Sequence, residues 1–388
     1  MARQLQNMKA DVDIGVRSDA RGTVTSTEIT SLFNSQIRLL KARGEYRGTR
    51  LVSPLDVFDT VSEYAAPTAY KATKLFRPTE GYQDVDLLTS NEWREKVSTT
   101  NLPIIADEQY TDSKILLVRV PTDEPAVQLE PFAEYDDNGT ATAVASTDAT
   151  NVRTADGARY KQSSAVAFDI DVSASVTNTA GIEKTLTTSV DLSENEDIAT
   201  GFLDIFIPNG LVTEITSVRL RWGSSSSNYW EVTTTACFNG QDFARGKNVI
   251  AFPWSSATET GTPDASAVDY VQILVSYGAS QADVNLVVVQ DLRFANPTEY
   301  THEYYSTRFT RSNAGTLQDE FSADDDYSLL EDFEDDMLVQ GVIAEVHALK
   351  SNYNDSARAS TKFEEFYTQV TNNKPSEKQK PSQSYYEM

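Results

Sequence analysis

The sequence predicts a mixed, mainly β protein, in which a central antiparallel β-sandwich of the jelly-roll type is flanked by an N-terminal α+β region and by C-terminal helices. Within residues 165–296, short segments bounded by turn-forming residues alternate apolar and polar side chains, which is the period of a strand with one buried face. Helical periodicity is confined to the two sides of this region. A run of roughly seven or eight such strands without intervening helices is typical of a sandwich.

The length of 388 residues favours more than one domain. The expected order is an N-terminal helical and α+β domain at 1–134, a linker or exposed loop at 135–164, the jelly roll at 165–296, a C-terminal helical region at 297–371 and an extended tail at 372–388.

Two helix starts are expected in the N-terminal part. Thr25 and Glu28 have the spacing of a capping box, in which each side chain satisfies a free amide of the other residue. An apolar stripe follows, and Gly44 supplies a stop. Ser53 followed by Pro54 predicts the N-cap and first turn of a short second helix, because proline at the first helical position loses no hydrogen bond.

Residues 113–121 form a β-branched apolar run between turn formers, which predicts a strand. Residues 135–164 are rich in Thr, Asp, Gly and Ala and have almost no large apolar side chains. This composition predicts the linker or exposed loop.

Strand alternation assigns the aromatic rings of residues 222–254 to two faces. Trp222 continues the inward set of Val218 and Leu220, and the same argument places Trp230 and Trp254 in the core. Tyr229 and Glu231 then point outward. The four consecutive serines before them predict a hairpin connection between two strands.

The C-terminal part is expected to be helical again, with Ser322 as an N-cap followed by acidic residues that suit the start of a helix. Its apolar stripe comprises Leu330, Phe333, Met337, Leu338, Val342, Val346, Leu349 and Tyr353. A shorter helix is expected around residues 363–370, and the polar, proline-containing residues 372–388 predict an extended tail that orders against a partner.

Charge and composition exclude several classes of function. Against 33 Lys and Arg stand 58 Asp and Glu, and the net charge of −25 repels nucleic acid and anionic membranes. Halophilic adaptation and an ordinary acidic surface both account for this excess. The single cysteine, Cys237, forms no intramolecular disulfide, and no apolar run has the length of a membrane span. We therefore expect a protein made in the cytoplasm, with no membrane and no sequence-specific nucleic acid as partner.

No catalytic, metal or cofactor site is predicted. His302 and His347 lie outside any nucleophile motif, and both are interpreted as structural or surface histidines. The acidic run of residues 324–336 lacks the glycine and terminal Glu of a calcium loop and is interpreted as a solvated helix face, with weak cation binding as the lesser alternative. Because carboxylate pairs need no motif, a glycan-degrading enzyme remains a third class of function, but no pair stands out among so many acids.

One stretch resembles a known family. The hairpin through Trp222, Gly223 and Trp230, the turn Gly246-Lys247-Asn248 before the strand VIAFPW, and the following GTPDASAVDYVQILVSY are similar to galactose-binding-like jelly-roll modules in structural proteins of tailed bacteriophages. The resemblance covers about the middle third of the chain. It implies a β-sandwich and carries no catalytic residue.

The resemblance and the helical flanks together lead to two hypotheses. The first is a non-enzymatic virion structural protein, at the head–tail connector, neck, collar or tail, that forms a symmetric homo-oligomer and docks on portal, neck or tail components through its helical ends. It would be found in the virion and made in the host cytoplasm. The alternative is a carbohydrate-binding module of a viral fibre or secreted protein, which would engage cell-surface glycans through the outward Tyr229 and Glu231.

Overall fold

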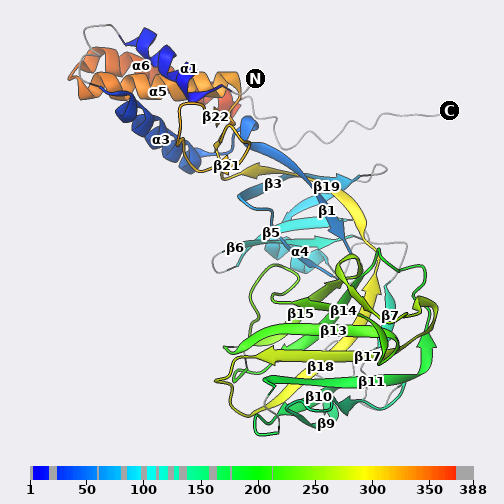
Figure 1. Ribbon diagram of the computed structural model, residues 1–388. Helices are drawn as coiled ribbons and strands as arrows, with labels where there is room; N and C mark the ends of the chain where they lie inside the picture. Colours follow the sequence, from blue (N-terminus) through cyan, green and yellow to red (C-terminus); the bar gives the residue numbers. More distant parts are fainter. Residues whose placement is uncertain are drawn as a thin grey trace, which may run out of the picture. The chain divides into compact units, whose positions relative to one another are not determined.

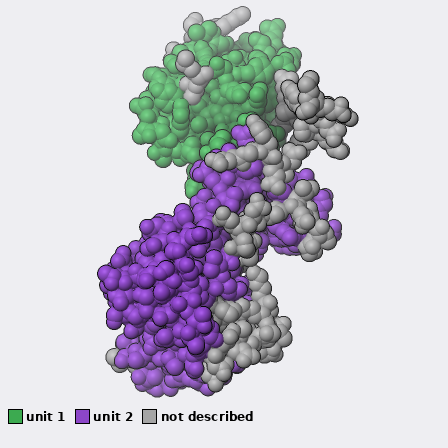
Figure 2. All heavy atoms as spheres, turned by 90° about the vertical axis from the view of Figure 1, so that its right-hand side faces the viewer, with its two compact units in different colours: residues 1–53, 67–75, 302–388 green, residues 54–66, 76–301 purple. Residues whose placement is uncertain are grey.

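The structure, a computed structural model, describes residues 3–16, 24–58, 61–79, 85–97, 103–110, 113–120, 126–130, 138–156, 164–174, 177–211 and 213–372. It divides into two compact units (Figure 2). We call residues 1–53, 67–75 and 302–388 the helical unit, and residues 54–66 and 76–301 the sandwich unit. The fold class is the predicted one: mainly β, with antiparallel sheets in the middle of the chain and helices toward both ends (Figure 1).

The helical unit is built around a helix from the C-terminal part of the chain. This helix, α5, packs against three others, which come from both ends of the sequence. The bounds are α1 Leu5–Gly15, α3 Ser26–Arg43, α5 Asp332–Leu349 and α6 Tyr353–Asn372. Short elements of the same unit are the 3₁₀ turn η1 Arg47–Thr49 and the strands β20 Thr310–Arg311, β21 Leu317–Gln318 and β22 Tyr327–Ser328.

Helix α3 begins and ends as predicted. Thr25 is its N-cap and exchanges capping-box hydrogen bonds with Glu28. The backbone N–H of Gly44 closes the helix on the carbonyl of Leu40. The buried face of α3 is formed by Ile29, Phe33, Gln36, Ile37 and Leu40.

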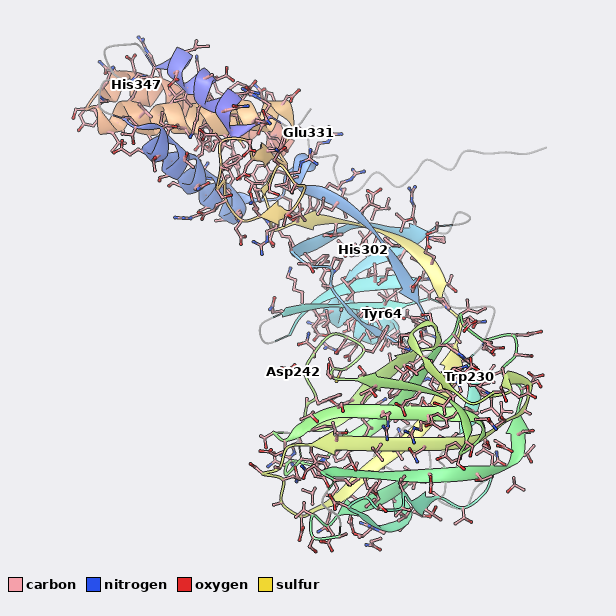
Figure 3. The ribbon with its side chains drawn as sticks, in the orientation of Figure 1. Tyr64, Trp230, Asp242, His302, Glu331 and His347 are labelled. Atoms are coloured by element: carbon pink, nitrogen blue, oxygen red, sulfur yellow. The ribbon has the colours of Figure 1, made fainter. Side chains whose placement is uncertain are left out.

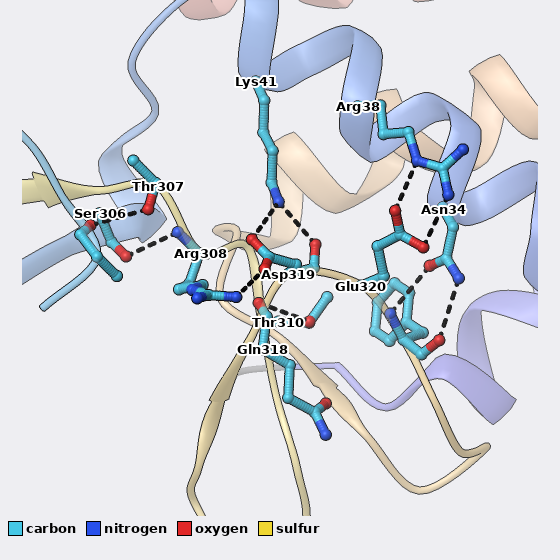
Figure 4. Close-up of polar contacts among 12 residues, drawn as sticks. Asn34, Arg38, Lys41, Ser306, Thr307, Arg308, Thr310, Gln318, Asp319 and Glu320 are labelled. Atoms are coloured by element: carbon cyan, nitrogen blue, oxygen red, sulfur yellow. Dashed lines mark hydrogen bonds and ion pairs between the residues drawn. The ribbon is translucent and has the colours of Figure 1, made fainter. Parts of the chain in front are cut away.

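Polar contacts fasten the exposed side of α3 to the segment that precedes α5 (Figure 4). The guanidinium of Arg38 donates two hydrogen bonds, of 2.6 and 2.9 Å, to the carboxylate of Glu320. The Asn34 amide donates to the Phe321 carbonyl at 3.0 Å and accepts from the Phe321 N–H at 2.9 Å. Residues about 290 positions apart are thereby held in one unit.

The start of α5 differs from the prediction at Ser322. The Asp326 carboxylate accepts hydrogen bonds from the backbone N–H groups of Ser322 and Ala323, at 2.6 and 2.8 Å, which makes a turn there. The following residues pair as β22 with β20. The helix begins instead at Asp332, after the N-cap Glu331. Helix α6 is longer than expected, and residues 373–388 of the predicted tail lie outside the described residues.

The helix predicted at Ser53 and Pro54 is wrong, because both residues lie in strand β1, Arg50–Val57. This strand is at the edge of a sheet of order β1-β19-β3, with β3 Tyr70–Pro78 and β19 Thr298–Ser306. Proline is tolerated on an edge strand, where its missing N–H faces away from the ladder. The local N-cap signal was overridden by pairing with a strand about 250 residues away.

The sandwich unit contains two large antiparallel sheets. The first, called the β13 sheet, has the order β16-β14-β13-β17-β11-β8, with bounds β16 Thr258–Thr260, β14 Asn228–Thr234, β13 Ile215–Ser225, β17 Val268–Tyr277, β11 Thr179–Val190 and β8 Thr142–Ala143. The second, called the β12 sheet, has the order β15-β12-β18-β10-β9, and β7 pairs with β18. Its bounds are β15 Gly246–Pro253, β12 Thr200–Ile207, β18 Val284–Ala295, β10 Ser164–Ile170, β9 Ala149–Asp156 and β7 Val127–Glu130.

Part of the segment predicted to be a linker belongs to these sheets. Residues 142–143 pair with β11 as β8, and residues 149–156 pair with β10 as β9. Short Thr- and Ala-rich strands at sheet edges need few large apolar side chains, so their composition resembles that of a loop. Residues 135–137 and 157–163 of the segment lie outside the described residues.

The core lies between the two sheets, and the predicted alternation is confirmed there. Trp222 is 0% exposed, Trp230 5% and Trp254 2%. The ring centroid of Trp222 lies 6.3 Å from that of Trp230, 5.3 Å from Trp254 and 5.2 Å from Phe294. These four rings form the aromatic centre of the sandwich.

A smaller sheet completes the sandwich unit, with the order β2-β6-β5-β4. The predicted strand at 113–121 is confirmed as β6 over residues 113–119. The bounds are β2 Glu63–Ala65, β4 Asp86–Thr89, β5 Ile104–Tyr110 and β6 Ser113–Arg119, and helix α4 Ser90–Lys96 follows β4. In the part of the chain that the structure describes, no helix is both long and apolar enough to span a membrane.

Candidate functional site

A transverse row of polar side chains crosses the outer face of the β13 sheet. The strand register places Glu183 beside Gln272, Gln272 beside Arg221, and Arg221 beside Glu231, with Thr258 at the edge. Because side chains alternate along each strand, these residues lie on the face opposite to the core residues Leu220 and Trp222. Strands β14, β13, β17 and β11, which carry the row, run side by side in Figure 1.

Hydrogen bonds hold the row in one arrangement. The Gln272 amide donates to Glu183 at 3.0 Å and to the Tyr270 hydroxyl at 3.0 Å, and that hydroxyl donates to Glu183 at 2.9 Å. Arg221 donates through Nη1 to Gln272 at 3.1 Å and through Nε to Glu231. Side chains locked by such partners lose little conformational freedom when they bind a ligand.

Tyr229 lies on the same face, as the sequence predicts. Its ring centroid is 4.5 Å from the Arg221 guanidinium carbon, and its side chain is half-buried. Two residues farther along β13, Gly223 is paired with Tyr229 on one side and with Tyr270 on the other. Gly223 therefore lies between the two tyrosines. A Cβ atom at Gly223 would lie 2.3 Å from the Asn228 carbonyl oxygen, so the backbone leaves no room for a side chain at this position.

The serine stretch forms the predicted hairpin connection. Strand β13 ends at Ser225 and β14 begins at Asn228. The Ser225 hydroxyl accepts hydrogen bonds from both the backbone N–H and the side-chain amide of Asn228, each at 3.1 Å. The turn therefore fixes where β14, and with it Tyr229, starts.

Burial alters the acid–base behaviour of two groups on this face. The pKa of Tyr270 is raised, first by burial and then by its hydrogen bond to Glu183, so the hydroxyl remains a neutral donor. The pKa of Arg219 is lowered by burial and by the neighbouring charge of Arg221. Arg219 contacts Glu231 at 3.5 Å.

A separate cavity of about 420 Å³ lies elsewhere in the sandwich unit, and its lining includes Glu63, Cys237, Asp242, Lys247 and Arg293. Burial raises the pKa of the Cys237 thiol to about 12, which makes a thiolate nucleophile unfavourable. Sequence reasoning did not find this cavity, since its walls come from strands far apart in the chain.

The charges beside this cavity neutralise one another. Arg293 contacts Asp291 at 2.9 Å and Asp204 at 3.6 Å, and Lys247 contacts Asp204 at 2.8 Å. Two cations and two carboxylates thus form a paired, largely buried cluster, which we interpret as structural. The outer face of the β13 sheet is the stronger candidate.

Both histidines are buried in the helical unit. His302 is 0% exposed on β19, with its Nε2 3.1 Å from the Thr73 hydroxyl, and His347 is 4% exposed on α5 (Figure 3). This burial agrees with the interpretation of both histidines as structural residues. Among the described residues, no group of three or more His, Cys, Asp or Glu side chains could hold a metal ion.

No protein-family model matches the chain, and no curated protein matches it. Solved structures that resemble it include the family 30 carbohydrate-binding module of a cellulosomal cellulase of Clostridium thermocellum, at 12% identity and TM-score 0.30, over 45% of this chain and 98% of that chain. Carbohydrate-binding modules from the β-sandwich superfamily match at 11% identity and TM-score 0.28, over 63% and 97%. Tailspike protein 4 of bacteriophage CBA120 matches at 10% identity and TM-score 0.26, over 44% of this chain and 21% of that chain. At these identities and TM-scores, the interpretation of the candidate face rests on its own residues.

Proposed function

We propose that the sandwich unit binds carbohydrate on the outer face of the β13 sheet. The observation that carries the proposal is the hydrogen-bonded row through Glu183, Gln272, Arg221 and Glu231 beside the half-buried ring of Tyr229. A sugar has apolar C–H faces that lie on aromatic rings and hydroxyls that both donate and accept hydrogen bonds. The row offers carboxylate acceptors and guanidinium donors on one face of the sheet, and the buried Gln272 amide holds them in position.

Binding without catalysis is part of this proposal. Glycosidases hold two carboxyl groups about 5 to 9.5 Å apart across the scissile bond. Glu183 and Glu231 are on strands separated by β17 and β13. Three strand spacings put their backbones about 14 Å apart. Both carboxylates are also engaged by neighbours in the row, so neither is poised as a free acid or nucleophile.

Replacing Tyr229 by Ala is expected to weaken glycan binding at least about tenfold, because the stacking surface is removed while the β-sheet stays folded. Wild type and variant would be compared on a glycan array, followed by calorimetric titration of the best ligands. The matched control is Arg245→Ala, an exposed residue of the sandwich unit outside this face. Equal affinities for wild type and Tyr229→Ala, with both folded by circular dichroism, would refute this assignment.

A role in a tailed virus particle is the second candidate. It is supported by the way in which both ends of the chain build one helical unit: the N–H of Leu5 bonds to the Asp326 carbonyl at 2.9 Å, and α1 and α3 pack on α5. Such a unit could attach the protein to a neighbouring subunit or to portal, neck or tail components while the sandwich unit binds a glycan. In this proposal the protein is part of the virion and is made in the host cytoplasm.

For this second role, native mass spectrometry of the purified protein is expected to give a homo-oligomer of one fixed copy number, and negative-stain images are expected to show a closed ring. Removing α6, by truncation after Asn352, would leave the sandwich unit intact and should abolish the ring. A wild-type protein that stays monomeric at all concentrations would contradict self-assembly.

A further inference from the structure

Arg219 has donors that the protein does not use. It points to the outer face of the β13 sheet, two residues from Arg221 on the same strand. Among the described residues its one ionic contact runs from the buried Nε to Glu231 at 3.5 Å, without the geometry of a hydrogen bond, and no contact is made by the two terminal nitrogens. The side chain remains 28% exposed. A guanidinium has five N–H donors in a fixed fork, so the outer part of this fork faces solvent unpaired.

The charges around Arg219 leave a local excess of positive charge. Arg219 and Arg221 both contact the same oxygen of Glu231, Oε2. The other carboxylate of the row, Glu183, is on β11, two strands from β13, and accepts from Tyr270 and Gln272. Two cations therefore share one anion at the centre of the face, on a chain whose net charge is −25. The overall charge repels anions at long range, so an anionic ligand can be held on this face only by direct contact with these arginines.

We propose that the ligand of this face is an acidic glycan, in which a sugar carboxylate pairs with Arg219 and another sugar of the same chain stacks on Tyr229. The inference rests on the proposed glycan-binding function and names its ligand class. A planar carboxylate matches the guanidinium fork and supplies the acceptor that the Arg219 donors lack.

The spacing along the strand suits a polymer. Tyr229 is paired with Gly223, and Thr233 with Arg219. Four residues of strand separate the two positions, which corresponds to about 14 Å. An oligosaccharide lying along β13 and β14 therefore spans the ring, the polar row and Arg219 together.

The test uses matched polysaccharide pairs: polygalacturonate, alginate, hyaluronate and polysialate, each with its carboxyl-reduced, neutral counterpart. Wild-type protein is expected to bind at least one acidic form about tenfold or more tightly than its neutral counterpart in calorimetric titrations at 150 mM salt. Arg219→Gln is expected to bring the two affinities to parity and to leave the neutral form unaffected. Tyr229→Ala is expected to weaken binding of both forms.

A matched control is Arg245→Gln, which removes an exposed arginine outside the face. It removes the same charge as Arg219→Gln but should keep the preference for the acidic form, because that preference is expected to come from the contact with Arg219 and not from the overall charge of the protein. Binding of neutral forms or other neutral glycans with no acidic preference would overturn the inference and leave the glycan-binding function standing. Absence of binding to every acidic and neutral glycan would overturn both. An acidic preference that survives Arg219→Gln would place the carboxylate elsewhere and refute this site.

Discussion

Trp222→Ala is expected to lower the free energy of unfolding of the sandwich unit by about 3 to 5 kcal/mol, the range found for large aromatic residues in tightly packed cores. The ring is fully buried and touches Trp230, Trp254 and Phe294. These neighbours come from strand β14, from the 3₁₀ turn Trp254–Ser256 after β15 and from strand β18, so they cannot collapse into the space without moving both sheets. The Trp222 Nε1 atom has no hydrogen-bond partner, and its removal therefore leaves no buried acceptor unpaired.

Tryptophan fluorescence in a urea titration measures this effect in one unit alone. All four tryptophans of the chain, at positions 93, 222, 230 and 254, belong to the sandwich unit, so three reporters remain in the variant. The control is Tyr229→Ala, which removes a half-buried ring and should lower the free energy of unfolding by less than about 1 kcal/mol. A cost of less than about 1 kcal/mol for Trp222→Ala would mean that the aromatic centre is not the core of the sandwich.

The second large effect is a pH dependence of the helical unit that arises from Asp335. Burial raises the pKa of this carboxyl to about 7, although the Ser328 hydroxyl and Arg3 act in the opposite direction. The folded protein then holds a proton that the unfolded chain releases near its ordinary pKa of 3.8. Between about pH 4 and pH 7 this carboxyl binds more protons in the folded than in the unfolded state, so its contribution makes the free energy of unfolding fall as the pH rises, by on the order of 4 kcal/mol.

Asp335→Asn is expected to reduce this slope and to make the helical unit more stable than wild type at pH 8, where the wild-type carboxyl is ionised and buried. The two proteins should be similarly stable near pH 3.5. Denaturation followed by circular dichroism at 222 nm reports the long helices, all of which belong to this unit in the described part of the chain. Some slope should remain, because burial also raises the pKa of Glu345.

The control for this experiment is Asp325→Asn, an exposed carboxylate a short distance before α5. The stability of this variant should depend on pH in the same way as that of the wild type. If the stability of Asp335→Asn relative to wild type does not increase between pH 4 and pH 8, the sign derived for Asp335 is wrong.

The sequence predicted those parts of the fold that local patterns determine. Alternation alone placed Trp222, Trp230 and Trp254 inside, and the capping box at Thr25 marked the start of α3. Prediction failed where distant pairing decides. The strand at Pro54 and the edge strand β8 depend on partners farther along the chain, and their own residues carry helix or loop signals. Strand β9 pairs with the next strand, β10, but its Thr- and Ala-rich residues also resemble a loop.

The candidate face was predicted in part for the same reason. Alternation identified Tyr229 and Glu231 as outward residues, and both lie on the outer face. Arg221 alternates with the inward Leu220 and Trp222, but its place beside Gln272 and near Glu183 follows from the register of β13 with β17 and of β17 with β11. Sequence periodicity gives the face of a residue, whereas the register of a distant strand gives its neighbours. The row of four side chains therefore emerged only from the structure.

The most direct test of glycan binding on the β13 sheet is a crystal structure with the tightest ligand from the glycan array. We expect sugar density along the outer face of β13 and β14, with one ring on Tyr229 and hydroxyl contacts to Glu231 and Arg221. Density confined to the cavity near Glu63 and Lys247, or to any other surface, would contradict it.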